Sequence, residues 1–159
     1  MDQGRVKELF DYRDGKLFWK TNKGSQGLAG AEAGALRDDG YRLIGVDGRL
    51  YRAHKLIWLW HRNELPELLD HIDNDPTNNR IENLRIATRS ENGFNSGART
   101  NTKSGIKGVW WHQKNEKWRV SIYVNGRPTD FGCYEDLELA ELVAIEARNK
   151  YHGAFARHA

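Results

Sequence analysis

Acidic, amide and imidazole side chains are concentrated in one segment near the middle of this chain. Asp70 and His71 are adjacent, and Asn83 and Asn92 follow them. An imidazole titrates near neutral pH and can take a proton from water, whereas carboxylate and amide oxygens are ligands for hard divalent ions. Because Cys133 is the single cysteine, a zinc site built from Cys-x-x-Cys pairs is excluded. Any metal must therefore be held mainly by oxygen or imidazole.

The segment that holds these side chains is predicted to be a strand, a loop, a strand and a helix. Residues 73–80 are all turn formers, which predicts an ordered surface loop between apolar anchors at 68–69 and 84–86. Thr88 and Glu91 have capping-box spacing, so a helix is expected to begin there and carry Asn92. The simpler alternative is that these polar residues only cap turns on a solvated loop.

The predicted ββα order resembles the HNH, or His-Me finger, endonucleases, in particular the homing enzymes of phages and group I introns. The resemblance is carried by Asp70-His71, the run NNRIENL at 78–84, Glu91-Asn92, the upstream stretch 51–60 and the segment LFDYRDGKLFW. It covers nearly all of residues 1–95, which are expected to be an HNH endonuclease domain.

The resemblance implies a role for each residue of the motif. Asp70 and Asn92 would supply oxygen ligands to one divalent ion, and His71 would be the general base that activates water. Asn83 would hold the loop and orient His71. Hard oxygen ligands with open water positions favour magnesium or manganese over zinc, so Mg²⁺ or Mn²⁺ is the expected cofactor.

Four other polar residues have a structural interpretation beside a functional one. Asp73 and Asp75 are expected to shape the loop, with an outer-sphere role at the metal as the alternative. His54 matches a histidine that recurs in the family's upstream helix, but a histidine packed against the core is an equally good account. His61, at the end of that helix, is expected to be structural or solvent-facing.

Elements upstream of the motif can be predicted from periodicity and turn signals. The pattern predicts a helix over 5–12, a strand over 16–19 after Asp14-Gly15, a hairpin of 41–46 and 49–51 about Asp47-Gly48, and a mostly buried helix over 53–61. The glycine- and alanine-rich stretch 24–35 has no useful periodicity.

The C-terminal third is predicted to be a second domain, 105–159, after a linker over 96–104 of small, polar and basic residues. Three strands are expected over 108–112, 117–124 and 128–134, with a hairpin turn at Asn125-Gly126. A helix over 136–151 follows, with Asp136 as its N-cap. The fold class is therefore α+β: an HNH ββα-metal core followed by a three-stranded antiparallel sheet packed on one helix.

Residues 104–156 resemble the APETALA2-type DNA-binding domain of plant transcription factors, which also occurs in phage HNH endonucleases. The resemblance is carried by Gly108-Val109, Lys117-Trp118, Phe131-Gly132-x-Tyr134, Tyr151-His152-Gly153 and Phe155-Ala156. It implies that the sheet lies in the DNA major groove. The residues expected to contact DNA are Lys107, Trp110, His112, Lys117, Arg119, Ser121, Tyr123 and Arg127. Trp110 and Ser121 replace charged residues of the plant pattern, so a plant-like target site cannot be inferred.

Composition agrees with a nucleic-acid partner but does not require one. The net charge is +3 and the pI about 9.0. Apolar residues make up 38% of the chain, and no apolar run approaches the length of a membrane span. The N-terminus lacks a signal-peptide pattern, so we expect a cytoplasmic protein that does not bind membranes.

Together these features predict a sequence-directed DNA endonuclease, a homing-type nicking enzyme that acts on double-stranded DNA as a monomer. One alternative is a non-catalytic DNA-binding regulator with a degenerate HNH core. Another is a protein that binds or cleaves RNA, because basic and aromatic surfaces also bind single strands.

Overall fold

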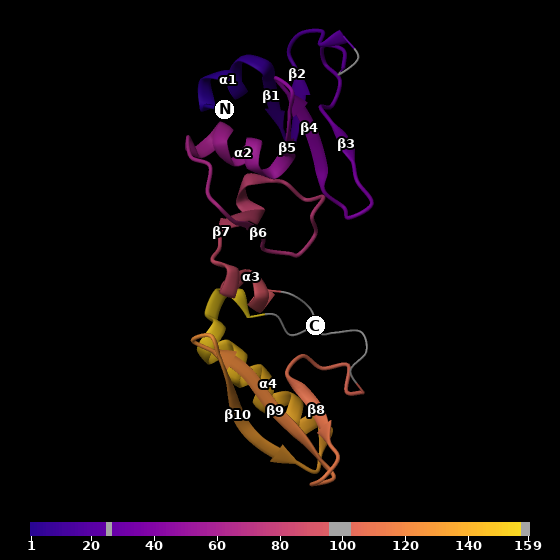
Figure 1. Cartoon of the computed structure of the whole chain (residues 1–159), viewed down its shortest axis with the longest axis vertical. Coiled ribbons are helices and arrows are strands. Elements are labelled where there is room, and N and C mark those ends of the chain that lie inside the picture. The colour runs from indigo at the N-terminus through magenta and orange to yellow at the C-terminus, as the bar shows by residue number, and fades with distance from the viewer. Residues whose placement is uncertain (25–26, 96–102, 157–159) are drawn as a thin grey trace. The chain divides into compact units, whose positions relative to one another are not determined.

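The computed structural model describes residues 1–24, 27–95 and 103–156 (Figure 1). The chain divides into two compact units, Met1–Ala87 and Thr88–Ala159. Most of the linker predicted over 96–104 lies outside the described residues. The predicted domain limits therefore stay a prediction.

Among its described residues, the elements of the first unit include two helices, a short 3₁₀ helix and three small antiparallel sheets, paired as β1-β2, β3-β4-β5 and β6-β7. Its elements are α1 (Gln3–Leu9), β1 (Phe10–Arg13), β2 (Lys16–Trp19), β3 (Ala35–Leu36), β4 (Arg42–Val46), β5 (Arg49–Arg52), α2 (Ala53–Arg62), β6 (Leu69–His71), η2 (Ile81–Asn83) and β7 (Leu84–Ile86). This part of the chain is mixed α and β, as its sequence predicts.

The N-terminal helix is shorter than its pattern predicts. The prediction over 5–12 is wrong beyond Leu9, because the next four residues form β1 and pair with β2. Asp14 and Gly15 adopt positive φ and reverse the chain between the two strands. Phe10 therefore belongs to the hairpin and not to the helix, and its side chain is completely buried.

The central hairpin is confirmed, with β4 and β5 paired antiparallel about Asp47 and Gly48. Both turn residues have positive φ, which is the backbone that a two-residue hairpin loop requires. β3 was not predicted, because a two-residue strand in a glycine-rich stretch has no period of its own. Its place is fixed only by pairing with β4.

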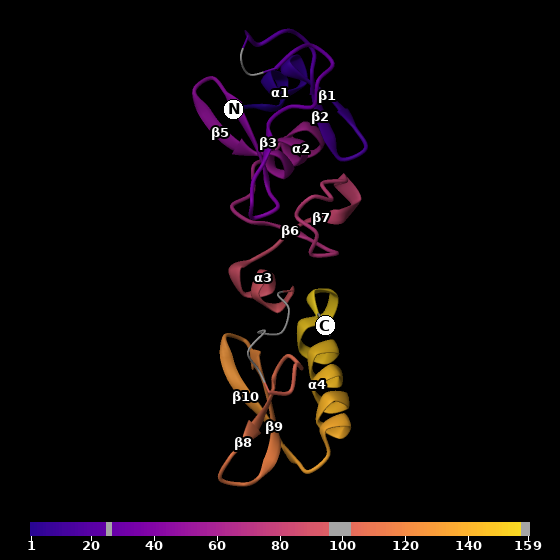
Figure 2. The same ribbon diagram turned by 90° about the vertical axis from the view of Figure 1, so that its right-hand side faces the viewer.

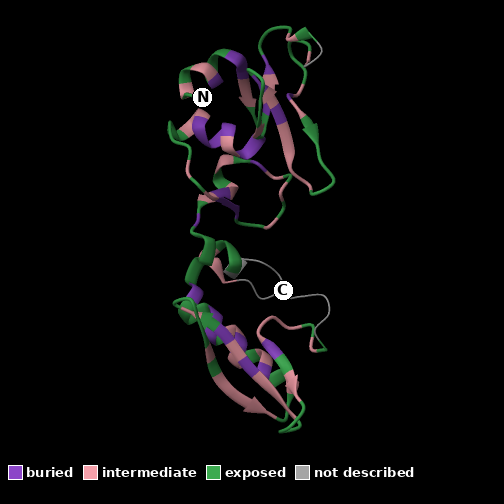
Figure 3. Ribbon diagram, viewed as in Figure 1, coloured by how far each residue is buried: buried purple, intermediate pink, exposed green. Residues whose placement is uncertain are grey.

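The core of the first unit is built around α2, which is buried along most of its length (Figure 3). Leu56 and Ile57 are fully buried, and they pack in one cluster with residues of α1, β1, β2 and β4. Leu69 and Leu84, the anchors of β6 and β7, belong to the same cluster. This packing attaches the central polar segment to a rigid core.

Among its described residues, the second unit contains the short helix α3, a three-stranded antiparallel sheet in the order β10-β9-β8, a long helix and a short 3₁₀ helix. Its elements are α3 (Arg89–Asn95), β8 (Val109–His112), β9 (Lys117–Val124), β10 (Arg127–Tyr134), α4 (Leu137–His152) and η3 (Gly153–Phe155). The three strands and the helix predicted after residue 105 are present, and Asp136 caps α4 by accepting from the backbone N–H of Leu139.

One face of this sheet is covered by α4 and the other is open (Figure 2). Val120 and Ile122 of β9 are buried, and Ala140 and Ala144 of α4 pack in the same core as Val120. Alanines four residues apart let the helix lie close to the sheet. The residues that alternate with Val120 and Ile122 therefore lie on the open face.

In the part of the chain that the structure describes, no helix combines the length and the apolar character needed to cross a membrane.

Candidate active site and nucleic-acid surface

Asp70 and His71 are consecutive residues of β6, and both are buried. Arg85, opposite Asp70 on β7, donates to one carboxylate oxygen through two nitrogens. Its Nε lies 2.8 Å and its Nη2 2.7 Å from Oδ2 of Asp70. The β6-β7 register thus gives the buried carboxylate a cationic partner. The sequence did not predict this ion pair, because it determines neither the register of β6 with β7 nor the face of the sheet on which Arg85 lies.

His71 is oriented by Asn79, a loop residue that is itself buried. Nε2 of His71 lies 2.9 Å from Oδ1 of Asn79. The amide orientation is supported by a hydrogen bond from Nδ2 of Asn79 to the carbonyl of Thr77 at 3.3 Å. Since Oδ1 can only accept, the network assigns the proton to Nε2 of His71 and the lone pair to Nδ1. A neutral imidazole in this tautomer can act as a base through Nδ1.

A second histidine packs against His71. The rings of His54 and His71 have centroids 5.1 Å apart and lie nearly perpendicular. Tyr41 contacts both rings, and the guanidinium of Arg52 lies 4.1 Å from the centroid of Tyr41. Burial, followed by the charges of His71, Arg52 and Lys55, lowers the pKa of His54 to about 3. His54 is therefore neutral at physiological pH, and its uncharged ring packs beside His71.

Asn83 holds the loop between β6 and β7. Its Nδ2 donates to Oδ1 of Asp73 and to the carbonyl of Asn78, at 2.9 and 2.8 Å, and its Oδ1 accepts from the backbone N–H of Asp73. Burial raises the pKa of Asp73, but hydrogen bonds from Asn83, the Asp75 N–H and Asn78 outweigh it, so this pKa lies below its usual value. Asn83 thus closes the loop, while the side chain that bonds His71 is Asn79.

The loop rests on the β1-β2 hairpin. Oδ1 of Asp14 lies 2.8 Å from Nη2 of Arg80, and the hydroxyl of Tyr12 accepts from the backbone N–H of Ile81 at 3.4 Å. A Cβ on Gly15 would lie 2.9 Å from the backbone nitrogen of Arg80. The close approach therefore requires glycine at this turn, where φ is +81°.

Asn92 lies on α3 and is exposed. The predicted capping box is confirmed: the backbone N–H of Thr88 donates to Oε2 of Glu91 at 2.7 Å, and that of Glu91 donates to Oγ1 of Thr88 at 3.2 Å. This helix belongs to the second unit, whereas Asp70, His71 and Asn83 belong to the first. The ββα arrangement and the pairing of Asp70 with Asn92 at a metal therefore stay predictions.

The donor chemistry of the predicted metal pair fits a hard cation, because Asp70 offers a carboxylate and Asn92 an amide oxygen. Within residues 1–24, 27–95 and 103–156, no group of three His, Cys, Asp or Glu side chains is placed to hold an ion. A metal at Asp70 would share the carboxylate with Arg85.

Most of the predicted DNA-contact residues are found on or beside the open face of the second sheet, but Arg127 pairs with Val124 and so shares the face of Val120 and Ile122. The register pairs Trp110 with Arg119 and His112 with Lys117, which places each pair on one face. Arg119, Ser121 and Tyr123 alternate with the buried residues of β9, while Arg127 is exposed at the start of β10. Lys107 precedes β8, and its Nζ donates to the carbonyl of Gly93 at 3.4 Å.

Two of the cations on this face have acidic partners. Nζ of Lys117 lies 3.2 Å from Glu135, and Nη2 of Arg119 lies 2.8 Å from Asp130. Neither ion pair was predicted from the sequence, because both depend on how β9 pairs with β10.

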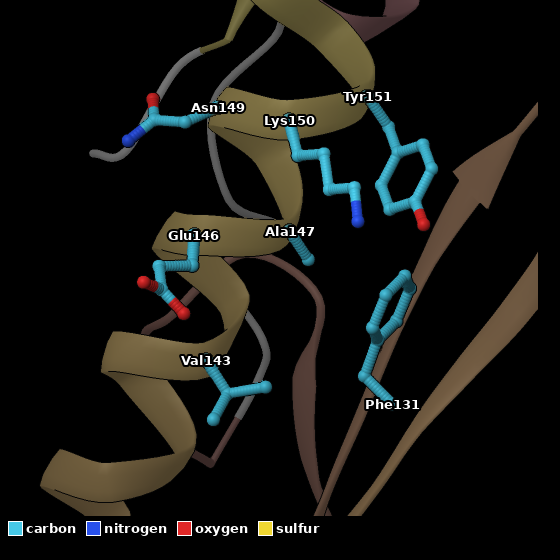
Figure 4. Close-up of a pocket in the computed structure, with 7 residues that line it drawn as sticks. All are labelled: Phe131, Val143, Glu146, Ala147, Asn149, Lys150 and Tyr151. Atoms are coloured by element: carbon cyan, nitrogen blue, oxygen red, sulfur yellow. The ribbon is translucent and has the colours of Figure 1, made fainter.

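A groove lies elsewhere in the second unit, between α4 and β10 (Figure 4). It is lined by Phe131, Val143, Lys150 and Tyr151 among others, and the rings of Phe131 and Tyr151 have centroids 5.7 Å apart. None of the predicted site residues line it.

Comparisons with known proteins agree with the motif. The model of the HNH endonuclease family matches residues 51–94, which include Asp70, His71, Asn79, Asn83 and Asn92. The chain is 32% identical over 108 residues to "Protein 3.8" of Escherichia phage T7, an alignment that covers 67% of this chain and 88% of the phage protein. No solved structure matches the chain. The chain therefore belongs to the family of this phage T7 protein, and its residues 51–94 carry an HNH endonuclease domain.

Proposed function

We propose that this protein is a metal-dependent DNA endonuclease that hydrolyses phosphodiester bonds with His71 as its general base. The observation that carries the proposal is the buried Asp70-His71 pair, whose imidazole is fixed by Asn79, within the segment that matches the HNH endonuclease family.

The residues of the matched segment divide the chemistry between them. Nδ1 of His71 takes a proton from water, and the resulting hydroxide attacks phosphorus while the bond to the leaving oxygen breaks. Asn79 keeps the ring in the required tautomer, and His54 excludes water from one side of it. Asp70 and Asn92 would hold Mg²⁺ or Mn²⁺, which supplies positive charge to the phosphate and the leaving oxygen when bound. The resemblance to homing enzymes implies 5′-phosphate and 3′-hydroxyl ends.

The second unit would position the nuclease on DNA. Its open sheet face supports an APETALA2-type role, with the sheet in the major groove of double-stranded DNA, and the whole chain is proposed to act as a monomer that nicks one strand. A relative from a phage fits an enzyme that works on DNA in the cytoplasm of a bacterial host.

Cleavage of supercoiled plasmid tests the chemistry separately from binding. We expect nicked circles with magnesium, none with EDTA, and a loss of at least about 100-fold in rate for His71→Ala. His61→Gln is the matched control, since it alters a histidine of the same unit that has no part in the proposed chemistry. Equal rates for wild type and His71→Ala would contradict the proposal.

One observation favours the second candidate, a DNA-binding regulator without catalysis. Arg85 places a cation on the carboxylate that would hold the metal. If the wild type binds duplex DNA but leaves it uncut across several divalent metals and targets, the regulator becomes the better account.

A further inference from the structure

An acidic residue stands on the face that is proposed to meet a polyanion. Asp130 of β10 pairs in register with Ser121, so both lie on the open face of the second sheet. An unpaired carboxylate there would repel phosphate. Asp130 is instead bonded to Arg119, whose own register partner Trp110 is 39% exposed on the same face.

The carboxylate of Asp130 is fixed from two sides. Oδ2 accepts from Nη2 of Arg119 at 2.8 Å, and Oδ1 accepts from the backbone N–H of Gly132 at 3.1 Å. A β-bulge between Asp130 and Gly132 produces the second bond, because it removes that N–H from the regular ladder. The hydrogen bonds from Arg119 and Gly132 lower the pKa of Asp130, so it stays ionised. Asp130 is thus a rigid support for the guanidinium.

The N–H groups of Arg119 that do not bond Asp130 suit the edge of a base better than a phosphate. Nε of Arg119 is buried and has no hydrogen-bond partner among the described residues, and one Nη2 hydrogen is taken by Asp130. The other terminal N–H groups form a fork that matches the two acceptors, O6 and N7, which guanine presents in the major groove. Because Asp130 neutralises the charge of Arg119, the pair offers little general attraction to the DNA backbone.

We infer that Arg119, positioned by Asp130, reads a guanine in the major groove of duplex DNA, and that Asp130 sets the specificity of this surface. The inference rests on the proposed function of the second unit. It names one base of the target sequence and one residue that positions the side chain reading it. An arginine held in one orientation discriminates between bases, whereas a mobile one contacts any phosphate within reach.

The test is selection of bound sequences from a pool of randomised duplexes, using the full chain in EDTA so that cleavage cannot distort the result. We expect the wild type to enrich guanine at one position. Arg119→Lys should lower that preference about tenfold, because an ammonium cannot make the bidentate contact. Asp130→Asn should lower it about threefold at the same position, because a neutral amide makes the weaker hydrogen bond.

Glu135→Gln is the matched control. Glu135 also pairs with a cation of this unit, Lys117, and is 84% exposed. Both acid-to-amide changes should raise affinity for non-specific DNA, since each removes a negative charge. Only Asp130→Asn should change the base preference, and in the Arg119→Lys background it should change it no further. Unchanged unfolding midpoints check that all the variants fold.

Three results would overturn the inference. A guanine preference that survives both Arg119→Lys and Asp130→Asn, or its absence from the wild type, would refute the reading role while leaving DNA binding intact. No binding to any duplex would refute the proposed role of the second unit as well.

Discussion

Two arginine–aspartate pairs, one in each unit, join neighbouring strands at nearly the same distance but in different surroundings. Nη2 of Arg85 lies 2.7 Å from Asp70, and Nη2 of Arg119 lies 2.8 Å from Asp130. The side chains of the first pair are 16% and 7% exposed, and those of the second are 37% and 47% exposed. Burial therefore separates them: the first pair compensates charges removed from water, whereas the second stays accessible to a ligand.

The largest effect is expected from Arg85→Met, which leaves the carboxylate of Asp70 buried without its guanidinium partner. We expect the free energy of unfolding of the first unit to fall by about 3 kcal/mol, measured by urea unfolding in EDTA. Magnesium should restore part of the loss, and it should stabilise this variant more than the wild type, because the ion takes the place of the guanidinium.

Arg80→Met is the control for that measurement. Arg80 also pairs with an aspartate of the first unit, Asp14, but the two side chains are 58% and 73% exposed. Its removal should cost less than about 1 kcal/mol. Equal losses for the two variants would show that burial does not decide the strength of these pairs.

An effect of similar size, but spread over pH, is expected from His54. Because its pKa is about 3 in the folded chain and about 6.5 when unfolded, the unfolded chain binds more protons between these values. The contribution of His54 to the free energy of unfolding is fully present above pH 6.5. It is lost on acidification, by up to about 1.4 kcal/mol per pH unit. Urea unfolding between pH 7 and pH 4 measures the slope.

His54→Phe should flatten that slope, because the buried ring can no longer be protonated. Tyr41→Phe keeps the ring that contacts His54 and should keep the slope. If His54→Phe retains the full wild-type slope, another group of the first unit is responsible for the acid sensitivity.

The smallest effect on stability is expected from Arg119→Met on the second sheet. An exposed pair of this kind contributes little to folding, so the thermal midpoint should stay within error of the wild type. A clear fall in the midpoint would mean that Arg119 serves mainly to hold the sheet together, and the contrast between the two pairs would disappear.

Local signals in the sequence predicted much of the fold. The Asp47-Gly48 hairpin, the capping box of Thr88 and Glu91, and the Asp136 cap are set by neighbouring residues, and all three are present. The prediction that the first helix continues past Leu9 was wrong, because pairing with β2 overrides the helical pattern of Phe10 to Arg13.

The site itself was predicted in its residue types but not in its contacts. Asp70 and His71 lie on the expected strand, yet their partners Arg85 and Asn79 were not foreseen. Asn78 and Asn79 are identical in type and adjacent, so the sequence does not show which amide turns inward. That choice depends on distant segments that pack against the loop, and these have no local signal.

The contact of the Gly15 turn with Arg80 also bears on how the candidate site assembles. The hairpin that supports the loop is synthesised long before the loop, and its strands pair through short-range contacts that form quickly. The loop joins it only through contacts between residues far apart in the chain, such as Asp14 with Arg80, and closing so long a segment is slow. During synthesis, the orientation of the His71 imidazole is therefore among the last features of the first unit to form.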